Sequence, residues 1–410
     1  MGTALWIVLV VGSIIAGVAI VGVLVATRAR EPLVAVAGLT GFAASVWAFG
    51  RLGTEYARAD VLLYALGMSL AALGGGYALC SALLDRLART PRLPMVTIGE
   101  EAHRTRAILL VCAESASYDP RETSRELGRL AEEGLIDLTL GVTPFMYAAQ
   151  KSRYRAMGGE SPARAQVRQL SEAVETALDR ERFDRVDVAW CDGDDGLAEC
   201  VARATAAGCR RIVVAPVAVG ESAEMADAKR TVDQMRLRES DVDLAYAHPV
   251  WSSDAVLAVL VERITKAVDH AASTGVALIA HGQPESREQA HSSFDADESA
   301  FVNRARLLLA EHGIDEARVL VAWAEWRDPD VGATVRHLAA LGCTRILVVP
   351  ACFPFDDLVT RLDIPIGIRQ ARIDPSIAVI RLNAWTDDQR IVDAVREAIV
   401  EAEAELLSEP

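Results

Sequence analysis

The sequence lacks the features of a nucleic-acid-binding protein or of a protein held together by disulfides. Acidic residues outnumber basic ones, with 57 Asp and Glu against 42 Lys and Arg, and the net charge is −15. Because binding to phosphate needs a basic face, nucleic acid is not an expected partner. The seven cysteines form no CxxC pair and no regular framework. We therefore expect free thiols in a reducing compartment.

Charged residues are also missing from three long apolar runs near the N-terminus, residues 5–27, 32–50 and 61–84. Each run is long enough to cross a bilayer as a helix. No basic residue precedes the first run, so we expect a retained membrane helix and no cleaved signal peptide. Since a transport path needs polar groups within the membrane, their lack favours an anchor over a transporter.

Basic residues flank these runs unevenly. The side reached after the first and third runs carries more of them: Arg28, Arg30, Arg86, Arg89 and Arg92, against Arg51 and Arg58. The positive-inside rule then predicts an integral protein of the cell (inner) membrane, with the N-terminus outside and the remainder of the chain in the cytoplasm. Small residues in GLTGFAAS and SLAALGGGYA suit close helix packing and permit homo-oligomers through these helices.

From about residue 94 the sequence changes to short β-branched runs that alternate with charged helical stretches. These runs are AILLVCA, RVDVAWC, RRIVVAP and VDLAYAH, then VALIAHG, RVLVAWA, TRILVVP and IAVIRLN. Continuous apolar strands separated by helices are typical of a parallel sheet covered on both faces. We therefore predict an α/β fold of two doubly wound lobes, residues 94–270 and 271–410, after a membrane anchor of residues 1–93.

The two lobes resemble each other in sequence. AAGCRRIVVAPVAV (206–219) aligns with ALGCTRILVVPACF (340–353), and the tripeptide VAW lies upstream of each. Any two α/β units share composition, but the matched Gly-Cys and VAW favour a duplication. In such sheets ligands bind beyond the carboxyl ends of the strands. His281 and Cys112, which follow the opening strands of the two copies, are therefore expected to face one cleft.

The polar residues at these strand ends suggest metal or proton chemistry. Taken alone, a histidine such as His281 as often caps a turn, but a neutral imidazole can bind a metal or accept a proton near neutral pH. Asp356 and Asp357 follow another strand and are either helix N-caps or oxygen ligands for a cation. His281, Asp356, Asp357 and Cys112 together form a candidate site for a loosely held divalent transition metal.

Four stretches resemble the ferrochelatase family, whose members insert ferrous iron into a porphyrin. They are RYRAMGGESPARAQ (153–166), LIAHGQP (278–284), EWRDPDV (325–331) and FPFDDLVTRLDI (353–364). The first is most like the form that acts on coproporphyrin, and the last two are also similar to the smaller cobalt chelatases that act on sirohydrochlorin. The resemblance extends over both predicted lobes, in the family's order.

The resemblance implies roles for particular residues. His281 would be the proton acceptor or first metal ligand, and Asp356 and Asp357 would deliver the cation. Contacts with the macrocycle or its propionates fall on these residues: Tyr154, Gly158, Gly159, Ser161, Pro162 and Trp326. The two glycines would allow a tight turn, and core packing explains Tyr154 and Trp326 at least as well.

The chain departs from the family at its metal site. The family's glutamate falls on Val359, its histidine falls on Asp357, and Cys112 stands where some relatives have tyrosine. Valine can neither bind a metal nor take a proton. Catalysis would then depend on displaced carboxylates, and a displacement of about 1 Å can cost roughly 10²-fold in rate.

We therefore expect a membrane-anchored, ferrochelatase-like metal chelatase of the lyase type, acting in haem biosynthesis. Its partners would be a porphyrin or related tetrapyrrole and membrane lipid. Fe²⁺ would be its substrate metal, with Co²⁺ as an alternative, and no tightly bound cofactor is predicted. One alternative is a degenerate homologue that binds haem or metal as a carrier, sensor or scaffold, with Cys112 as a thiolate ligand. Another is a cobalt chelatase that acts on sirohydrochlorin.

Overall fold

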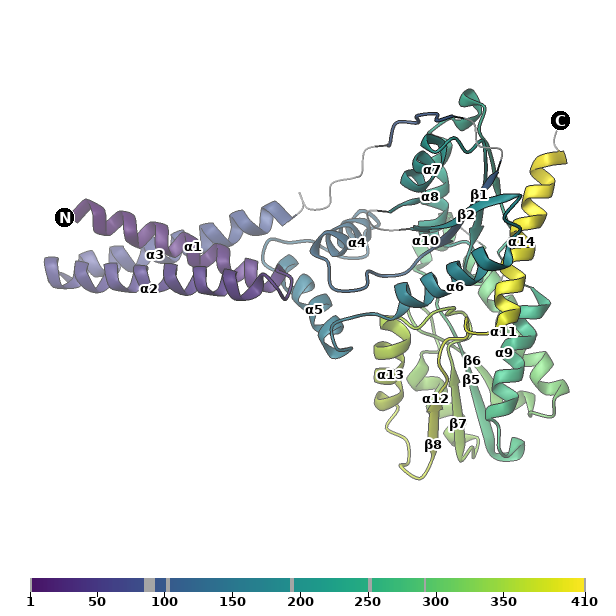
Figure 1. Cartoon of the computed structure of the whole chain (residues 1–410). Coiled ribbons are helices and arrows are strands. Elements are labelled where there is room, and N and C mark those ends of the chain that lie inside the picture. Colours follow the sequence, from purple (N-terminus) through teal and green to yellow (C-terminus); the bar gives the residue numbers. More distant parts are fainter. Residues whose placement is uncertain are drawn as a thin grey trace. The chain divides into compact units, whose positions relative to one another are not determined.

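The structure is a computed structural model that describes residues 2–84, 93–100, 104–191, 195–249, 253–290 and 293–408 (Figure 1). It divides into two compact units, residues 1–91 with 117–160, and residues 92–116 with 161–410. Arg86, Arg89 and Arg92, on which the predicted membrane orientation partly depends, lie outside the described residues.

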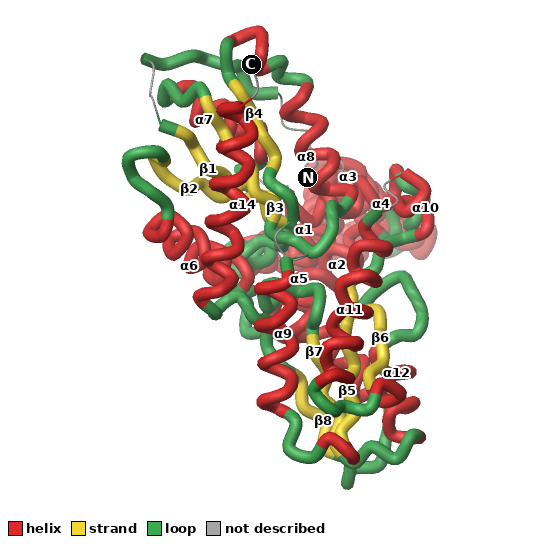
Figure 2. The backbone as a smooth tube through the Cα atoms, turned by 90° about the vertical axis from the view of Figure 1, so that its right-hand side faces the viewer, coloured by secondary structure: helices red, strands yellow, loops and turns green. Residues whose placement is uncertain are grey.

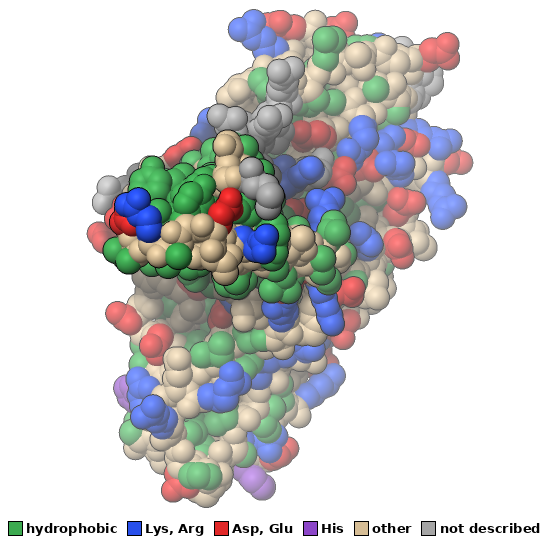
Figure 3. All heavy atoms as spheres, turned by 90° about the vertical axis from the view of Figure 1, so that its left-hand side faces the viewer, with side chains coloured by type: hydrophobic (Ala, Val, Ile, Leu, Met, Phe, Trp, Pro, Cys, Tyr) green, Lys and Arg blue, Asp and Glu red, His purple; other side chains and the backbone are tan. Residues whose placement is uncertain are grey.

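The N-terminal part of the first unit consists of the helices α1 (Gly2–Val25), α2 (Glu31–Tyr56) and α3 (Ala59–Leu84). All of them are long and apolar enough to cross a membrane. Apolar side chains cover much of their outer surface (Figure 3). The helices agree with the three predicted runs, except that α2 continues beyond residue 50. The sequence RLGTEY remains helical, and the helix ends at Ala57, which adopts a left-handed conformation.

Small residues bring these helices close together, as their sequence suggested. A Cβ atom on Gly17 would lie 2.1 Å from the carbonyl oxygen of Leu73, and one on Gly76 would lie 2.4 Å from that of Ile14. Ser13 bonds the hydroxyl of Ser69 at 2.7 Å within the bundle. Glycine therefore permits backbone contact that any side chain would prevent.

Residues 117–160 contain the helices α4 (Pro120–Glu132) and α5 (Thr143–Ala156). The sequence predicts this segment as part of the first lobe, but in the structure it packs on the ends of the apolar helices. The hydroxyl of Tyr118 donates to the carbonyl oxygen of Val25 at 2.9 Å, and Ser124 donates to that of Leu84 at 3.2 Å. Since the last carbonyls of a helix have no partner within it, these side chains cap α1 and α3.

The second unit contains two parallel sheets within its described residues (Figure 2). The first has the order β2-β1-β3-β4 and the second has the order β6-β5-β7-β8. The strands are β1 (Thr105–Val111), β2 (Phe183–Trp190), β3 (Arg211–Pro216), β4 (Asp243–Tyr246), β5 (Thr274–Ala280), β6 (Val319–Trp323), β7 (Arg345–Val349) and β8 (Ala378–Arg381). Every residue of β1 and β5 is buried, which explains their continuous apolar sequence. The predicted fold class is confirmed.

Helices connect and cover the two sheets. They are α6 (Ala163–Ala177), α7 (Leu197–Ala206), α8 (Ala223–Asp233), α9 (Asp254–Ala267), α10 (Glu285–Ala290), α11 (Phe294–Glu311), α12 (Val331–Ala340), α13 (Ile364–Gln370) and α14 (Gln389–Ser408). A π-helical turn (Val359–Asp363) precedes α13. The sheets also match in detail, because the N–H of Cys191 donates to Val111 and the N–H of Ala324 donates to Ala280, each at 2.9 Å.

The two lobes exchange their last helices. Helix α14, the last element of the second lobe, packs against β3 and β4 of the first sheet, while α9 packs against β7 of the second. Glu403 on α14 is 2% exposed and binds Arg182 at 2.5 Å. The division at residue 270 therefore separates the sheets but not the helices that cover them.

Candidate functional site

His281 directly follows β5, at the carboxyl edge of the second sheet. Gly282 turns the chain there with a φ of +84°. A Cβ atom on Gly282 would lie 2.4 Å from the carbonyl oxygen of Glu325, and the N–H of Glu325 donates to the carbonyl of His281 at 3.1 Å. Both the conformation and the close contact require glycine. The loop after β6 is thereby held directly against the histidine.

The imidazole of His281 is fixed by one hydrogen bond and two aromatic neighbours. Its Nδ1 lies 2.9 Å from the carbonyl oxygen of Gly282, and the ring centroids of Phe353 and Phe294 lie 5.2 Å and 6.2 Å away. Because a carbonyl oxygen only accepts, Nδ1 carries the hydrogen and Nε2 of the neutral ring carries the lone pair. Nε2 can therefore accept a proton or bind a metal.

Glu298, on α11, supports the turn at His281 from beneath. It is 1% exposed, and one of its carboxylate oxygens accepts the N–H groups of both His281 and Gly282 at 3.0 Å. Burial raises the pKa of Glu298 to about 7 despite these hydrogen bonds and the attraction of the histidine. A carboxyl group with this pKa changes its charge within the neutral range.

Carboxylates also control the protonation of His281. Burial opposes the charged imidazolium, but the negative charges of Glu325, Glu298 and Asp357 and the hydrogen bond to the carbonyl of Gly282 outweigh it. The pKa of His281 is therefore raised above its ordinary value. A histidine in such surroundings is a stronger base than one in water.

Asp357 and Glu114 bring a second pair of carboxyl groups to the same region. Burial and the charge of Glu114 raise the pKa of Asp357 to about 7, against the attraction of His281. Glu114, two residues beyond Cys112, accepts the N–H of Leu358 at 3.0 Å and the hydroxyl of Ser161. The structure thus brings Glu114 from the first lobe to the segment of the second lobe that carries Asp357.

Asp356 has different surroundings from its neighbour. It is 4% exposed, and its carboxylate binds Arg381 at 3.2 Å, Arg361 at 3.7 Å and the N–H of Ala384 at 3.3 Å. Its own N–H donates to Gln166 at 2.8 Å. Asp356 therefore joins its own segment to two others, one at Gln166 and one at residues 381–384. These contacts give Asp356 a structural role.

Asp357 shows the N-cap geometry that the sequence left open. The N–H of Thr360 donates to the Asp357 carboxylate at 2.7 Å, and the N–H of Asp357 donates to the Thr360 hydroxyl at 2.8 Å. Asp357 is thus a cap whose charge also acts on His281.

Trp326 is exposed and its backbone is strained. Its side chain is 51% exposed, so the core-packing interpretation does not hold, and its φ is +62°. A bulky residue rarely adopts this conformation, and such strain tends to mark functional sites. The next residue, Arg327, binds Asp295 on α11 at 2.7 Å. The loop that contacts the turn at His281 through Glu325 therefore carries an exposed indole.

The remaining residues predicted to contact the substrate have defined local surroundings. Tyr154 is 3% exposed and packs edge-on against Tyr118, with centroids 6.3 Å apart, as the core-packing alternative required. Ser161 is buried and donates to Glu114, and Pro162 is the N-cap residue of α6. Gly158 and Gly159 make the expected tight turn, with φ of +93° and +101°.

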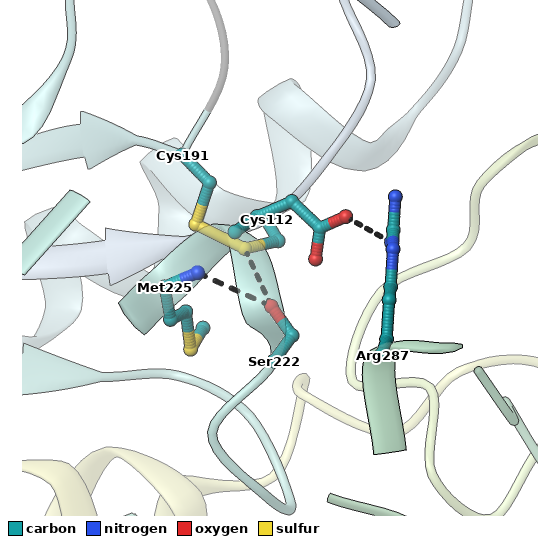
Figure 4. Close-up of a disulfide and its surroundings, with 6 residues drawn as sticks. Cys112, Cys191, Ser222, Met225 and Arg287 are labelled. Carbon is teal, nitrogen blue, oxygen red and sulfur yellow. Dashed lines mark hydrogen bonds and ion pairs between the residues drawn. A yellow bond between two sulfur atoms is a disulfide. The ribbon is translucent and has the colours of Figure 1, made fainter. Parts of the chain in front are cut away.

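Cys112 is not a free thiol in this structure. It is bonded to Cys191, the residue that follows β2, with Cα atoms 4.9 Å apart (Figure 4). The expectation of seven free cysteines is therefore wrong for this pair, as is that of Cys112 as a free thiolate ligand. The bond forms because the parallel register of β1 and β2 places the two residues side by side.

Within the described ranges, no group of three or more His, Cys, Asp and Glu side chains is placed to hold a metal ion. The predicted set of His281, Asp356, Asp357 and Cys112 is thus not assembled as one site. What the structure assembles is a histidine base among carboxyl groups that change charge near neutral pH. Such an arrangement can accept protons and attract a divalent cation.

Sequence reasoning missed Glu114 and Glu298. Glu114 directly follows the predicted strand AILLVCA, two residues after Cys112, so its position was available as a signal. Glu298 lies in the acidic run DADES of α11, where nothing in the order of residues distinguishes the buried Asp295 and Glu298 from the exposed Asp297.

A family model described as ferrochelatase matches residues 135–403. A ferrochelatase of Bradyrhizobium sp. is 28% identical over 255 residues, which cover 58% of this chain and 71% of that protein. A ferrochelatase of Thermosynechococcus vestitus is 24% identical, with 62% and 68% covered. One of Gloeobacter violaceus is 25% identical, with 62% and 82% covered.

Solved structures are similar at lower identity. SirB from Bacillus subtilis with Fe³⁺ aligns with a TM-score of 0.46 and 13% identity, covering 74% of this chain and 98% of that one. The sirohydrochlorin chelatase SirB from Bacillus subtilis subspecies spizizenii in complex with cobalt aligns with a TM-score of 0.44 and 14% identity, covering 73% and 96%.

Proposed function

Because the chain belongs to the ferrochelatase family, we propose that it is a tetrapyrrole metal chelatase that inserts ferrous iron into a porphyrin. The observation that carries this proposal is the state of His281. Its Nδ1–H is held by the carbonyl of Gly282, so Nε2 is a base, and the surrounding carboxylates raise its pKa. Metal insertion needs such a base, since two pyrrole nitrogens must lose their protons.

In this proposal His281 accepts a pyrrole proton at Nε2. The imidazolium that forms is stabilised by the negative charges of Glu325, Glu298 and Asp357, which need no rearrangement as the proton moves. Glu298 also holds the backbone of the turn through its two N–H acceptor contacts. The ring is therefore kept in position while its charge changes.

The carboxyl groups of Asp357 and Glu114 take the place of the family glutamate that is Val359 here. Val359 packs beside the core of the second lobe and supplies no charge. Asp357, with a pKa of about 7, can exist in either protonation state at neutral pH and so can relay the second proton. Together with Glu114 it also provides negative charge that favours the approach of Fe²⁺ as substrate.

Trp326 supplies the apolar contact for the macrocycle. Its exposed indole lies in the loop that is fixed to the turn at His281 through Glu325. A flat aromatic side chain can stack on a porphyrin with a gain of about 0.5–1.5 kcal/mol beyond the buried area.

We further propose that α1, α2 and α3 anchor the enzyme in a membrane. Their length and composition support this role, as do the exposed apolar side chains on their surface. In the last turn of α1, the ammonium group of Lys151 donates to the carbonyl oxygen of Val23. Lys151 thus caps α1 together with Tyr118, while Ser124 caps α3. Porphyrins are apolar and aggregate in water, so a membrane surface concentrates the substrate.

A second candidate function is haem or porphyrin binding without turnover. The observation that favours it is Val359, which removes the family's acid from the site. In that case the chain would bind porphyrin but release no metallated product, and Val359→Glu would restore metal insertion.

The test uses the full chain in detergent micelles, with ferrous iron and coproporphyrin or protoporphyrin under anaerobic conditions. Loss of porphyrin fluorescence and gain of haem absorption measure the rate. We expect His281→Ala to lower the rate by about 10²-fold or more, since a positioned general base contributes that much. His337→Ala is the matched control, because His337 is an exposed histidine on α12. Equal rates for the two variants, or no product from the wild type where a known ferrochelatase gives product, would contradict the proposal.

A further inference from the structure

The disulfide at the edge of the first sheet has no part in the proposed metal insertion. Cys112 and Cys191 directly follow Val111 and Trp190, which are paired in the ladder of β1 and β2. The N–H of Cys191 donates to the carbonyl oxygen of Val111 at 2.9 Å. The backbone therefore holds the two sulfurs side by side, whether or not they are bonded.

The second lobe uses the same two positions differently. There, His281 and Ala324 follow the paired residues Ala280 and Trp323, and the N–H of Ala324 makes the equivalent hydrogen bond to Ala280. The sulfur pair thus stands in the first copy where the second copy has its imidazole. Packing of the sheet does not require a bond here, because the second lobe forms the same ladder without one.

The bond is accessible to reagents in water. Cys112 is exposed and Cys191 is half-buried. The remaining cysteines are buried or lie within the apolar helix α3: Cys80, Cys200, Cys209, Cys343 and Cys352. Exposed disulfides are the ones that exchange with thiols, whereas buried ones resist reduction. A thiol in solution therefore meets the Cys112–Cys191 bond before any other cysteine of the described chain.

The two sulfurs differ in their surroundings (Figure 4). The Sγ of Cys112 lies 3.4 Å from the hydroxyl of Ser222, which is the N-cap of α8 and accepts the N–H of Met225 at 3.3 Å. The N-terminus of a helix stabilises negative charge. During exchange, negative charge develops on the sulfur that leaves. Cys112 is therefore the leaving sulfur, and Cys191 is the sulfur that is attacked.

We propose that Cys112 and Cys191 form a thiol–disulfide exchange site whose reaction partner is a dithiol. One thiolate of the dithiol bonds to the sulfur of Cys191, the S–S bond breaks, and Cys112 leaves with the electron pair and takes a proton. The second thiolate of the dithiol then attacks the mixed disulfide and releases Cys191, which also takes a proton. The dithiol is oxidised to a disulfide, and the protein gains two thiols.

The test uses the full chain in detergent micelles, equilibrated with mixtures of reduced and oxidised dithiothreitol. Exposed thiols are trapped with a maleimide under native conditions and located by peptide mass spectrometry. We expect Cys112 and Cys191 to change together from unlabelled to labelled as the mixture becomes reducing. Labelling of either residue at every mixture would overturn the proposal, as would a bond that is reduced only after the protein unfolds.

A pair of variants tests the assignment of the leaving sulfur. Ser222→Ala removes the hydroxyl beside Cys112, and we expect it to slow reduction by about threefold to tenfold, the value of one ordinary hydrogen bond. Ser253→Ala is the matched control, since Ser253 is the N-cap of α9 and accepts the N–H of Val256 at 3.2 Å. Both variants lose a helix cap. Equal reduction rates in the two variants would refute the assignment of Cys112.

Discussion

Replacing Gly282 by alanine tests whether the loop that carries Trp326 is locked against the end of β5. The new Cβ atom would lie 2.4 Å from the carbonyl oxygen of Glu325, at a φ of +84°. An alanine in this conformation costs about 1–2 kcal/mol, offset by about 0.4–1 kcal/mol because the unfolded chain becomes less flexible. The steric overlap adds about 1–3 kcal/mol. We therefore expect Gly282→Ala to lower the free energy of unfolding by about 2–4 kcal/mol.

Gly313 offers a matched control for this substitution. Its φ is +83°, but a Cβ atom there would meet no heavy atom within 4 Å. Gly313→Ala carries the conformational cost alone, so we expect a loss of about 1 kcal/mol or less. The difference between the two variants isolates the overlap with Glu325.

The assay is denaturant unfolding of the full chain in detergent, with the two variants and the wild type compared by their midpoints. Because Nδ1 of His281 is bonded to the carbonyl of Gly282, Gly282→Ala is also expected to lower the rate of metal insertion, while Gly313→Ala is not. Equal midpoints for the two variants would refute the argument that the loop and the strand end are in forced contact.

Three other substitutions probe the surroundings of the site. Burial raises the pKa of Glu298 to about 7 from 4.5, so its favourable contribution is complete below pH 4.5 and is lost as the pH rises through 7. Glu298→Gln should therefore raise the free energy of unfolding near pH 8 by up to about 3 kcal/mol and change little near pH 4.5, as measured by denaturant unfolding at both pH values. Trp326→Ala should change stability by less than about 1 kcal/mol, since the side chain is 51% exposed, yet weaken porphyrin binding about tenfold in a fluorescence-quenching titration. Asp356→Asn should lower stability by about 3 kcal/mol in thermal unfolding, because Arg381 is 15% exposed and would lose its carboxylate partner.

Periodicity and strand composition were sufficient to predict most of the architecture. The long uncharged runs predict the apolar helices, and the short β-branched runs that alternate with helical stretches predict both parallel sheets. The position of His281 was also predictable, because a glycine after a buried strand marks the turn at which ligands bind. Contacts between distant segments were not predictable in this way.

The disulfide illustrates this limit. Cys112 and Cys191 are 79 residues apart, and they meet only because β1 and β2 pair in a particular register. Asp356 and Asp357 illustrate another limit, since adjacent residues in a turn face different neighbours. From the sequence, the two aspartates were predicted to act together. In the structure, Arg381 and Arg361 neutralise the charge of Asp356, while Asp357 acts electrostatically on His281.

The packing of α14 on the first sheet has a consequence for synthesis of the protein. The strands β3 and β4 are complete at Tyr246, yet the helix that covers them is made only with residues 389–408. During translation the emerging first copy has an uncovered apolar face for the time needed to make the whole second copy. Chaperones that hold nascent chains are thus expected to act during this interval, and a premature stop codon anywhere before α14 would leave the first sheet without this helix.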